Sequence, residues 1–382
     1  MKERTQNLLI VILSSILTLF MCELGYRILV FKSVFVGSNI ATSHHFFCEY
    51  DPLLGWRHKK NIQARFVNKE YESLLAFNSK GLRGPEIAYE KGNNIYRILV
   101  LGDSFTESYT VNLADSFPEL LEKNLAGGIA HKNVQVINTG VGGYSTDQEY
   151  LYMKEEGQKF HPDLTILMFC ENDVYFNDQP SYYGRGFKPY FKLENGGLVL
   201  KNIPVPKPPL EAAPNPILKF WPKSYLRLYL KDRLKAKEKN RKHKFPNEQK
   251  IRLINYDQAT QYEWEITEKL IQEIKLLAVQ NGGNFLVVYI PTNILVEDKL
   301  LDVYLKTFAS LNGKIDVQKP RAVLKDLCAR NEIEFLDLTD PLRSRSQGRS
   351  LYIKNDGHWN KEGHHAVGQV LAEHISHADL GK

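Results

Sequence analysis

The sequence predicts a three-layer α/β/α fold, in which helices cover both faces of a doubly wound parallel sheet of five strands. Three observations predict this architecture and a separate apolar segment at the N-terminus. Five short apolar runs are rich in β-branched residues, each is followed by a helical pattern, and an uncharged apolar stretch lies near the N-terminus. Alternation of strands and helices on this scale is typical of α/β folds.

The expected strands are continuously apolar, as parallel strands buried on both faces are. They comprise residues 96–101, 134–138, 164–169, 284–290 and 333–338. The expected helices comprise residues 113–125, 146–159, 257–281, 317–331 and 361–375. We expect the flavodoxin-like strand order 2-1-3-4-5, with the active site outside the carboxyl ends of the strands and flanked by the loops after strands one and three.

The N-terminal segment predicts a membrane anchor. Lys2 and Arg4 precede an uncharged, mostly apolar stretch over residues 5–22, which is at the lower limit for a transmembrane helix. The alternative is a cleaved signal peptide, but no small-x-small cleavage site follows the stretch. We therefore expect residues 1–32 to form an uncleaved single-pass anchor with a cytoplasmic N-terminus, and the body to be extracytoplasmic, either periplasmic or at the cell surface.

Positive charge is concentrated in one segment. The formal net charge is +6, and residues 219–252 contain thirteen Lys/Arg against three Asp/Glu, so the rest of the chain is mildly acidic. A nucleic-acid-binding fold carries its positive charge over a binding face, so we expect no nucleic-acid partner.

Two segments do not fit the strand–helix alternation. Residues 33–94 carry turn signals and form an expected N-terminal extension packing on the core. Residues 178–256 are an insertion, first Pro-rich and then basic, between the two parts of the expected α/β domain, 95–177 and 257–382. A helix over residues 224–237 would place leucines along one side, which suits a lid, a membrane-surface helix or the solvated face of a capping helix.

Polar residues and glycines follow the first three expected strands, where an acyl-transfer enzyme would carry its catalytic groups. Ser104 lies in the turn after the first strand, where its Oγ can be exposed above the sheet. The loop after the second strand is glycine-rich, so its backbone can approach a substrate and offer an N–H to an oxyanion. Asn172 follows the third strand, and its amide is a second such donor.

A histidine near the C-terminus completes the set. His358 lies just before the last expected helix, and a serine hydroxyl needs a base of near-neutral pKa. A carboxylate beside it, Asp356, would orient the ring and stabilise the imidazolium. Each of these residues alone is a weak signal; their order along the chain is the stronger one.

That order resembles the SGNH (GDSL-like) hydrolase superfamily, whose four characteristic residues match Ser104, Gly143, Asn172 and His358, with Gly140 as a register alternative for the glycine. The resemblance implies a Ser104 nucleophile, a His358 base and an oxyanion hole formed by the Ser104 N–H, the Gly143 N–H and the Asn172 amide. The turn motifs at residues 51–56 (DPLLGW) and 81–84 (GLRG) also resemble those of membrane-anchored bacterial members.

The last motif departs from the usual spacing. The family commonly has Asp three residues before His, where this chain has Asn355, and the carboxylate of Asp356 is one residue closer. This Asp-x-His-Trp form resembles the alginate-type O-acetyltransferases. Glu171 stands where the family usually has glycine, so we expect it either to restrict the site or to be exposed, and we expect Asp103 and Asp173 to hold loop backbone.

The expected function is therefore that of a serine esterase acting on an acyl ester, with an acylated polysaccharide or a lipid as candidate substrates. The alternatives are an O-acetyltransferase or deacetylase of an envelope polysaccharide, and a non-catalytic envelope binding protein on the same fold. The mechanism requires no metal and no organic cofactor.

Overall fold

The computed structural model describes residues 2–31, 40–41, 43–68, 70–127, 129, 132–183, 185–207 and 245–377. They belong to two compact units. One contains the N-terminal helix, and the other comprises Ala41–Phe66, Glu70–Pro208 and Phe245–Lys382. The helix expected over residues 224–237, and the larger part of the basic segment at 219–252, lie outside the described residues.

The larger unit contains a five-stranded parallel sheet, which confirms the predicted fold class. Its spatial order is β7-β6-β8-β13-β14, which is 2-1-3-4-5 in chain order. The strands are β6 (Ile95–Gly102), β7 (Asn133–Asn138), β8 (Leu164–Phe169), β13 (Asn284–Tyr289) and β14 (Glu334–Asp337). Each lies within two residues of its predicted bounds, because continuous apolar runs mark buried parallel strands clearly.

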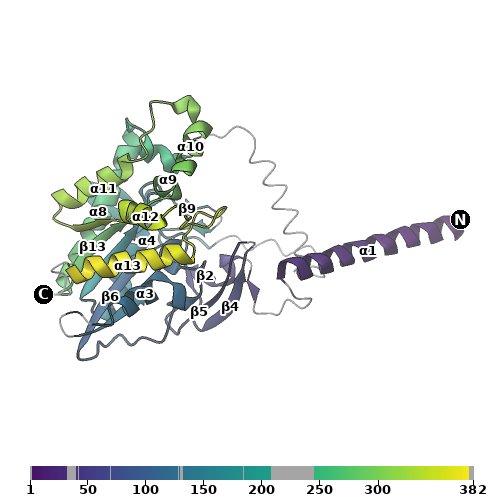
Figure 1. The fold of residues 1–382 in the computed structure, drawn as a ribbon, viewed down its shortest axis with the longest axis horizontal. Coiled ribbons are helices and arrows are strands. Elements are labelled where there is room, and N and C mark those ends of the chain that lie inside the picture. Colours follow the sequence, from purple (N-terminus) through teal and green to yellow (C-terminus); the bar gives the residue numbers. More distant parts are fainter. Residues whose placement is uncertain are drawn as a thin grey trace. The chain divides into compact units, whose positions relative to one another are not determined.

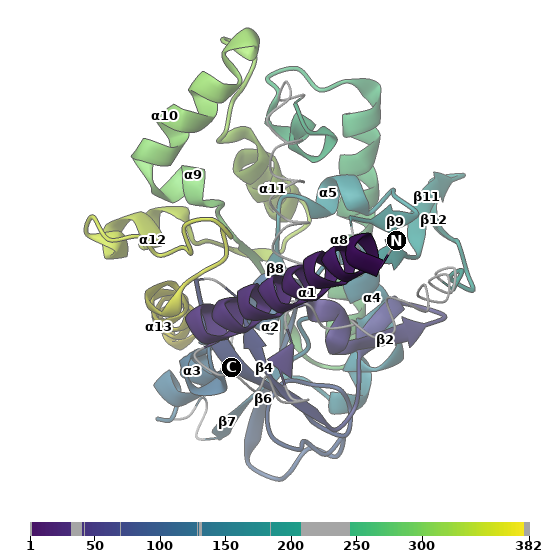
Figure 2. The ribbon, with the colours of Figure 1, turned by 90° about the vertical axis from the view of Figure 1, so that its right-hand side faces the viewer.

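Helices cover both faces of the sheet. Alternate residues of each strand point to opposite sides, so Leu99 and Leu101 of β6 belong to one apolar core and Ile98 and Val100 to the other. The first core is covered by α4 (Thr146–Glu155), α8 (Gln258–Gln280) and α11 (Lys319–Arg330), and the second by α3 (Phe117–Asn124), α12 (Thr339–Ser346) and α13 (Lys361–His377). In Figure 2 the layers appear with α3 and α13 on the left, β6 and β8 in the centre, and α4 and α8 on the right.

Two predicted helices are interrupted. The one expected over 113–125 consists of a short 3₁₀ turn, η2 (Leu113–Asp115), and then α3. Pro118 lies in the first turn of α3, where its missing N–H costs no hydrogen bond, so the helix begins there. The one expected over 146–159 is α4 followed by η3 (Gly157–Phe160), because Gly157 lies against the sheet: a Cβ there would be 3.0 Å from Leu99 Cδ2.

The N-terminal extension forms small β elements beside the sheet's carboxyl ends (Figure 1). Strands β2 (Cys48–Asp51) and β3 (Gly55–His58) form a hairpin, and β1 (Ile40–Ala41), β4 (Ile62–Val67) and β5 (Glu72–Phe77) form a three-stranded sheet. A separate apolar core includes Phe47, Phe66, Leu75 and also Tyr109, which follows α2 (Ser104–Glu107). The extension therefore packs against the segment that follows β6 and α2.

The described parts of the insertion pack against the extension and the sheet. They form the hairpins β9–β10 (Ser181–Tyr182, Gly186–Phe187) and β11–β12 (Tyr190–Glu194, Gly197–Lys201), and later η4 (Asn247–Arg252). A Cβ at Gly55 would lie 2.6 Å from the Phe187 carbonyl oxygen, and Val205 N donates to Pro52 O at 2.7 Å. The remaining helices between β13 and α11 are α9 (Asn293–Val296), α10 (Asp298–Thr307) and η5 (Ala309–Leu311).

The N-terminal helix α1 (Lys2–Phe31) contains one stretch, Arg4–Gly25, that is long and apolar enough to cross a membrane, with a mean hydropathy of 2.3. A signal sequence has the same length and composition. The prediction of an uncleaved, oriented anchor therefore stays a prediction.

A buried carboxyl in α8 makes stability depend on pH. Burial raises the pKa of Glu263 to about 8, so its folded pKa lies above its unfolded value. Its stabilising contribution is complete below the unfolded pKa and is lost as pH rises through the folded pKa. We expect Glu263→Gln to raise the unfolding free energy by about 1–2 kcal/mol at pH values above about 8, and by much less near pH 5. Thermal unfolding of both proteins across this range checks it; an equal gain at every pH would contradict it.

Candidate active site

Ser104 lies where the sheet's first strand turns into α2. Asp103 caps this helix, because its carboxylate accepts from Phe105 N at 2.8 Å, and burial raises the pKa of Asp103 to about 6. Asp103 therefore holds loop backbone, as predicted. Ser104 is half-buried while its chain neighbours are buried, so the turn presents the hydroxyl at the surface of a rigid element.

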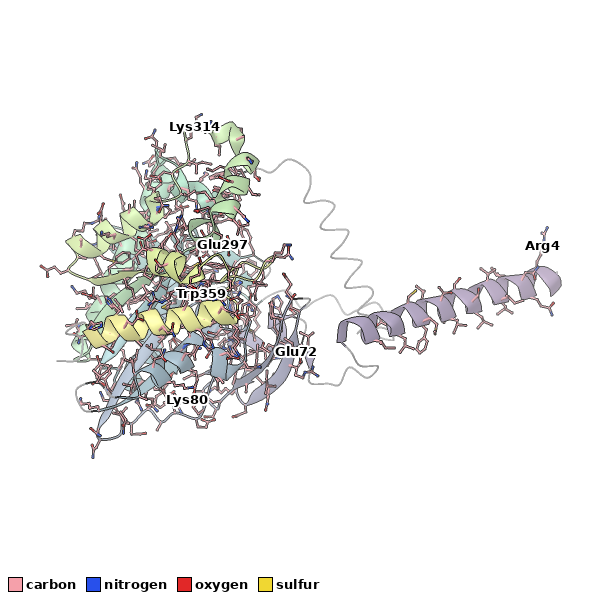
Figure 3. The ribbon with its side chains drawn as sticks, in the orientation of Figure 1. Arg4, Glu72, Lys80, Glu297, Lys314 and Trp359 are labelled. Carbon is pink, nitrogen blue, oxygen red and sulfur yellow. The ribbon has the colours of Figure 1, made fainter. Side chains whose placement is uncertain are left out.

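The structure brings Ser104 and His358 together, although they are 254 residues apart in the chain. Ser104 Oγ lies 2.7 Å from His358 Nε2. Apolar packing fixes the two loops to each other: Trp359, labelled in Figure 3, is fully buried and its ring centroid lies 4.8 Å from that of Phe105. The residues that flank the pair thus pack in one apolar core, which holds the Ser104 hydroxyl beside the His358 imidazole.

Asp356 contacts the other ring nitrogen of His358, Nδ1. Burial opposes ionisation of this carboxyl, but the hydrogen bond and charge of His358 and the hydroxyl of Tyr71 outweigh it, so the pKa of Asp356 is below its ordinary value. The carboxylate is therefore ionised at neutral pH and can stabilise an imidazolium. Asn355, at the family's usual Asp position, is exposed.

Two tyrosines that no sequence motif marks also contact this carboxylate. Tyr71 OH donates to Asp356 Oδ2 at 3.2 Å, and Tyr109 OH lies 3.2 Å from Asp356 Oδ1 and 2.9 Å from His358 Nδ1. Burial, with the nearby Tyr71 hydroxyl and the charge of Asp356, raises the pKa of Tyr109, so its hydroxyl stays protonated and can donate. The two tyrosine hydroxyls thus hold Asp356, which is one residue closer to the histidine in the sequence than the family's usual aspartate.

We expect Tyr109→Phe to lower kcat for an ester substrate about tenfold with little change in KM, since a hydrogen bond to a charged group contributes about 1.5–3 kcal/mol and part of this loss is recovered by water. Steady-state kinetics measure both constants. A rise in KM with unchanged kcat would assign Tyr109 to substrate binding and contradict a role in positioning Asp356.

Of the three glycine N–H groups in the loop after β7, one has no hydrogen-bond partner among the described residues. Gly140 N donates to Asn138 Oδ1 at 2.9 Å and Gly142 N to Glu107 Oε2 at 2.7 Å, whereas Gly143 N makes no hydrogen bond within the part of the chain that the structure describes. Gly143 has a φ of +82°, which favours glycine. The free donor therefore favours Gly143 over Gly140 for binding an oxyanion.

Asn172 follows β8, at the start of α5 (Asp173–Phe176). One hydrogen of its Nδ2 is donated to Tyr182 OH at 3.3 Å, which leaves the second available. The preceding Glu171 is buried, contacts Tyr289 OH, and forms an ion pair with Arg252. Of the two expectations for Glu171, exposure is wrong, because Arg252 at the end of the insertion neutralises it.

Asp173 is fully buried, and its carboxylate accepts from Cys170 N at 3.4 Å and from Thr146 Oγ1 at 3.1 Å. It holds the loop after β8, as expected. Within the described residues, no group of three or more His, Cys, Asp or Glu side chains is arranged to hold a metal ion.

Comparison with known families bears on this arrangement. Residues 100–217 match the GDSL-like Lipase/Acylhydrolase family. This part of the chain is therefore similar to the GDSL-like acylhydrolases. This match confirms the resemblance to the SGNH superfamily and supports an ester-hydrolysing enzyme. It includes Ser104, Gly143 and Asn172, but ends before Asp356 and His358.

Several solved structures resemble this chain at low identity. The acetyl xylan esterase AlAXEase is 12% identical, with a TM-score of 0.40, over 73% of this chain and 99% of that one. LAE5, an alpha/beta hydrolase from the metagenome of Lake Arreo, Spain, is 10% identical, with a TM-score of 0.40, over 75% and 97%. A lipolytic G-D-S-L family member from Veillonella parvula is 15% identical, with a TM-score of 0.39, over 74% and 100%. A comparison with curated proteins gave no match.

Proposed function

We propose that this chain is a serine esterase in which Ser104 is the nucleophile, His358 the general base and Asp356 the residue that orients the base. The observation that carries the proposal is the continuous series of contacts from Ser104 Oγ to His358 Nε2, at 2.7 Å, and from His358 Nδ1 to Asp356. A serine hydroxyl becomes nucleophilic only when a positioned base takes its proton. This series supplies that base and its counter-charge.

In the proposed mechanism, His358 Nε2 takes the proton of Ser104 as Oγ attacks the ester carbonyl. The Ser104 N–H, the Gly143 N–H and the free hydrogen of the Asn172 amide donate to the tetrahedral oxyanion. His358 then gives its proton to the departing alcohol, and an acyl-enzyme remains. Water attacks it with His358 again as base, which releases the acid and restores Ser104.

The experiment is hydrolysis of p-nitrophenyl esters, from acetate to palmitate, by the detergent-solubilised full chain and by its Ser104→Ala variant. Turnover that depends on Ser104 supports the esterase, and the preferred acyl length separates short-chain deacetylation from lipid cleavage. Turnover that the variant retains in full would contradict the proposal.

The spacing of Asp356 and His358 favours a second candidate, an O-acetyltransferase or deacetylase of an envelope polysaccharide, because it matches the Asp-x-His-Trp form. In the transferase, a sugar hydroxyl in place of water would resolve the same acyl-enzyme, whereas in the deacetylase water would resolve it. Acceptor competition separates the two: a transferase passes acetyl to an added saccharide faster than to water, and a hydrolase does not.

We also propose that α1 anchors the enzyme, with its N-terminus cytoplasmic and the catalytic unit on the other side of the membrane. Lys2 and Arg4 before the apolar stretch support this orientation. Protease treatment of intact cells and spheroplasts tests it. Digestion of the catalytic unit only after lysis of the inner membrane would contradict it.

A further inference from the structure

The hairpin β9–β10, at the start of the insertion, borders both side-chain and backbone donors of the proposed oxyanion hole. Tyr182 OH accepts from Asn172 Nδ2, and the Tyr182 ring lies beside Gly143, where a Cβ would be 3.2 Å from Cε1. Phe176 packs against Tyr182 with ring centroids 4.3 Å apart. The hairpin is thus a wall of the site.

Arg185, in the turn of the same hairpin, extends along the glycine loop. A Cβ at Gly143 would lie 3.3 Å from Arg185 Cγ, and a Cβ at Gly142 would lie 2.6 Å from Arg185 Nη2. Within the turn, Arg185 N donates to Tyr182 O at 3.1 Å. The hairpin also packs closely against the extension, where Phe187 O approaches Gly55. The guanidinium is therefore positioned before any substrate binds.

The charge of Arg185 has no carboxylate partner among the described residues. Its side chain donates from Nη1 to Cys48 Sγ at 3.4 Å, and a thiol is a weak acceptor. Burial raises the pKa of the Cys48 thiol to about 11, so the sulfur carries no counter-charge at neutral pH. The Glu107 carboxylate also lies near this point, since a Cβ at Gly142 would be 2.7 Å from Glu107 Oε2, but it forms no ion pair with Arg185: it accepts from Gly142 N and faces His58. By contrast, Arg57 on the neighbouring β3 donates to Glu49 at 2.9 Å.

A half-buried guanidinium with free donors fits planar or tetrahedral anionic oxygens, to which it can donate two parallel hydrogen bonds. We propose that Arg185 is a specificity-determining residue, which selects esters bearing a carboxylate or phosphate group near the scissile acyl bond. This inference rests on the proposed function, because it deepens the substrate class of that same site.

The test compares charged and neutral esters of matched shape on the full chain in detergent. On the alcohol side these are p-acetoxybenzoate and p-acetoxyphenyl phosphate against methyl p-acetoxybenzoate, and on the acyl side mono-p-nitrophenyl succinate against p-nitrophenyl butyrate. We expect Arg185→Gln to lower the charged-to-neutral ratio of kcat/KM about 10- to 100-fold for at least one pair. Arg185→Lys should keep part of that ratio, and Arg57→Gln, which removes the same charge nearby, should keep all of it.

Comparing the carboxylate-bearing esters with the phosphate-bearing ester identifies which anion is recognised. A charged-to-neutral ratio that Arg185→Gln leaves unchanged for every pair overturns the inference while Ser104-dependent turnover leaves the esterase intact. If no ester is turned over, the esterase fails, and calorimetry of the same charged esters on Ser104→Ala still decides the inference. Binding that weakens about tenfold or more in Ser104→Ala/Arg185→Gln supports it, and equal binding overturns it.

Discussion

Replacing Ser104 by alanine is expected to lower kcat for a p-nitrophenyl ester by roughly 10⁴-fold or more, with KM changed little. The variant removes the attacking oxygen and leaves Asp103, Phe105 and the cap of α2 in place, since none of their contacts uses the hydroxyl. The loss should therefore be chemical, with unfolding temperature unchanged. Residual turnover above water would come from the oxyanion donors alone.

The matched control is Ser108→Ala. Ser108 is a buried serine at the end of the same short helix, and its hydroxyl donates to backbone carbonyls, so its loss costs stability without removing a reacting group. We expect kcat to stay within a few-fold of the parent. Equal losses in Ser104→Ala and Ser108→Ala would indicate a structural effect on α2 and contradict a nucleophilic Ser104.

Replacing Asp356 by asparagine is expected to lower kcat roughly 10²- to 10⁴-fold, because the amide can no longer stabilise the imidazolium and its NH₂ would favour the wrong tautomer of His358. The carboxylate is half-buried between Tyr71 and Tyr109, and among the described residues no other carboxylate contacts Nδ1. Steady-state kinetics of the folded variant measure the loss.

The double variant Asp356→Asn/Asn355→Asp tests the shorter spacing. It restores a carboxylate at the position the superfamily commonly uses, but Asn355 is exposed and its N–H donates to Glu70 at 3.2 Å, so a carboxylate there should not reach His358. We expect no recovery of kcat. Recovery to the parent's rate would show that the loop can use either spacing and that the tyrosine contacts do not fix Asp356.

The sheet could be predicted because its information is local. Each strand is a continuous apolar run such as Leu164–Phe169, and burial on both faces requires nothing from distant residues. The strand order then follows from the rule for doubly wound sheets, which brings the loops that carry Ser104 and Asn172 to one edge. The approach of His358 to Ser104 is likewise an expectation of the ordered motifs, and the 2.7 Å contact agrees with it.

The rest depends on contacts that no sequence pattern marks. Tyr71 reaches Asp356 from 285 residues away, out of a segment whose turns give no hint of a catalytic contact. No sequence pattern marks Arg185 either, because its position beside Gly143 depends on how the insertion packs against the extension. Helix interruptions have local causes, such as Pro118 in the first turn of α3, but the amphipathic pattern runs on across them.

The central claim is that Ser104 is activated by His358 as a nucleophile, and covalent labelling tests it most directly. The full chain would be treated with a fluorophosphonate probe, digested and mapped by mass spectrometry, with His358→Ala as the matched control. The account predicts one adduct, on Ser104, that forms far more slowly in His358→Ala. No adduct on the folded protein, or an adduct on Ser104 that forms equally fast without His358, would contradict it.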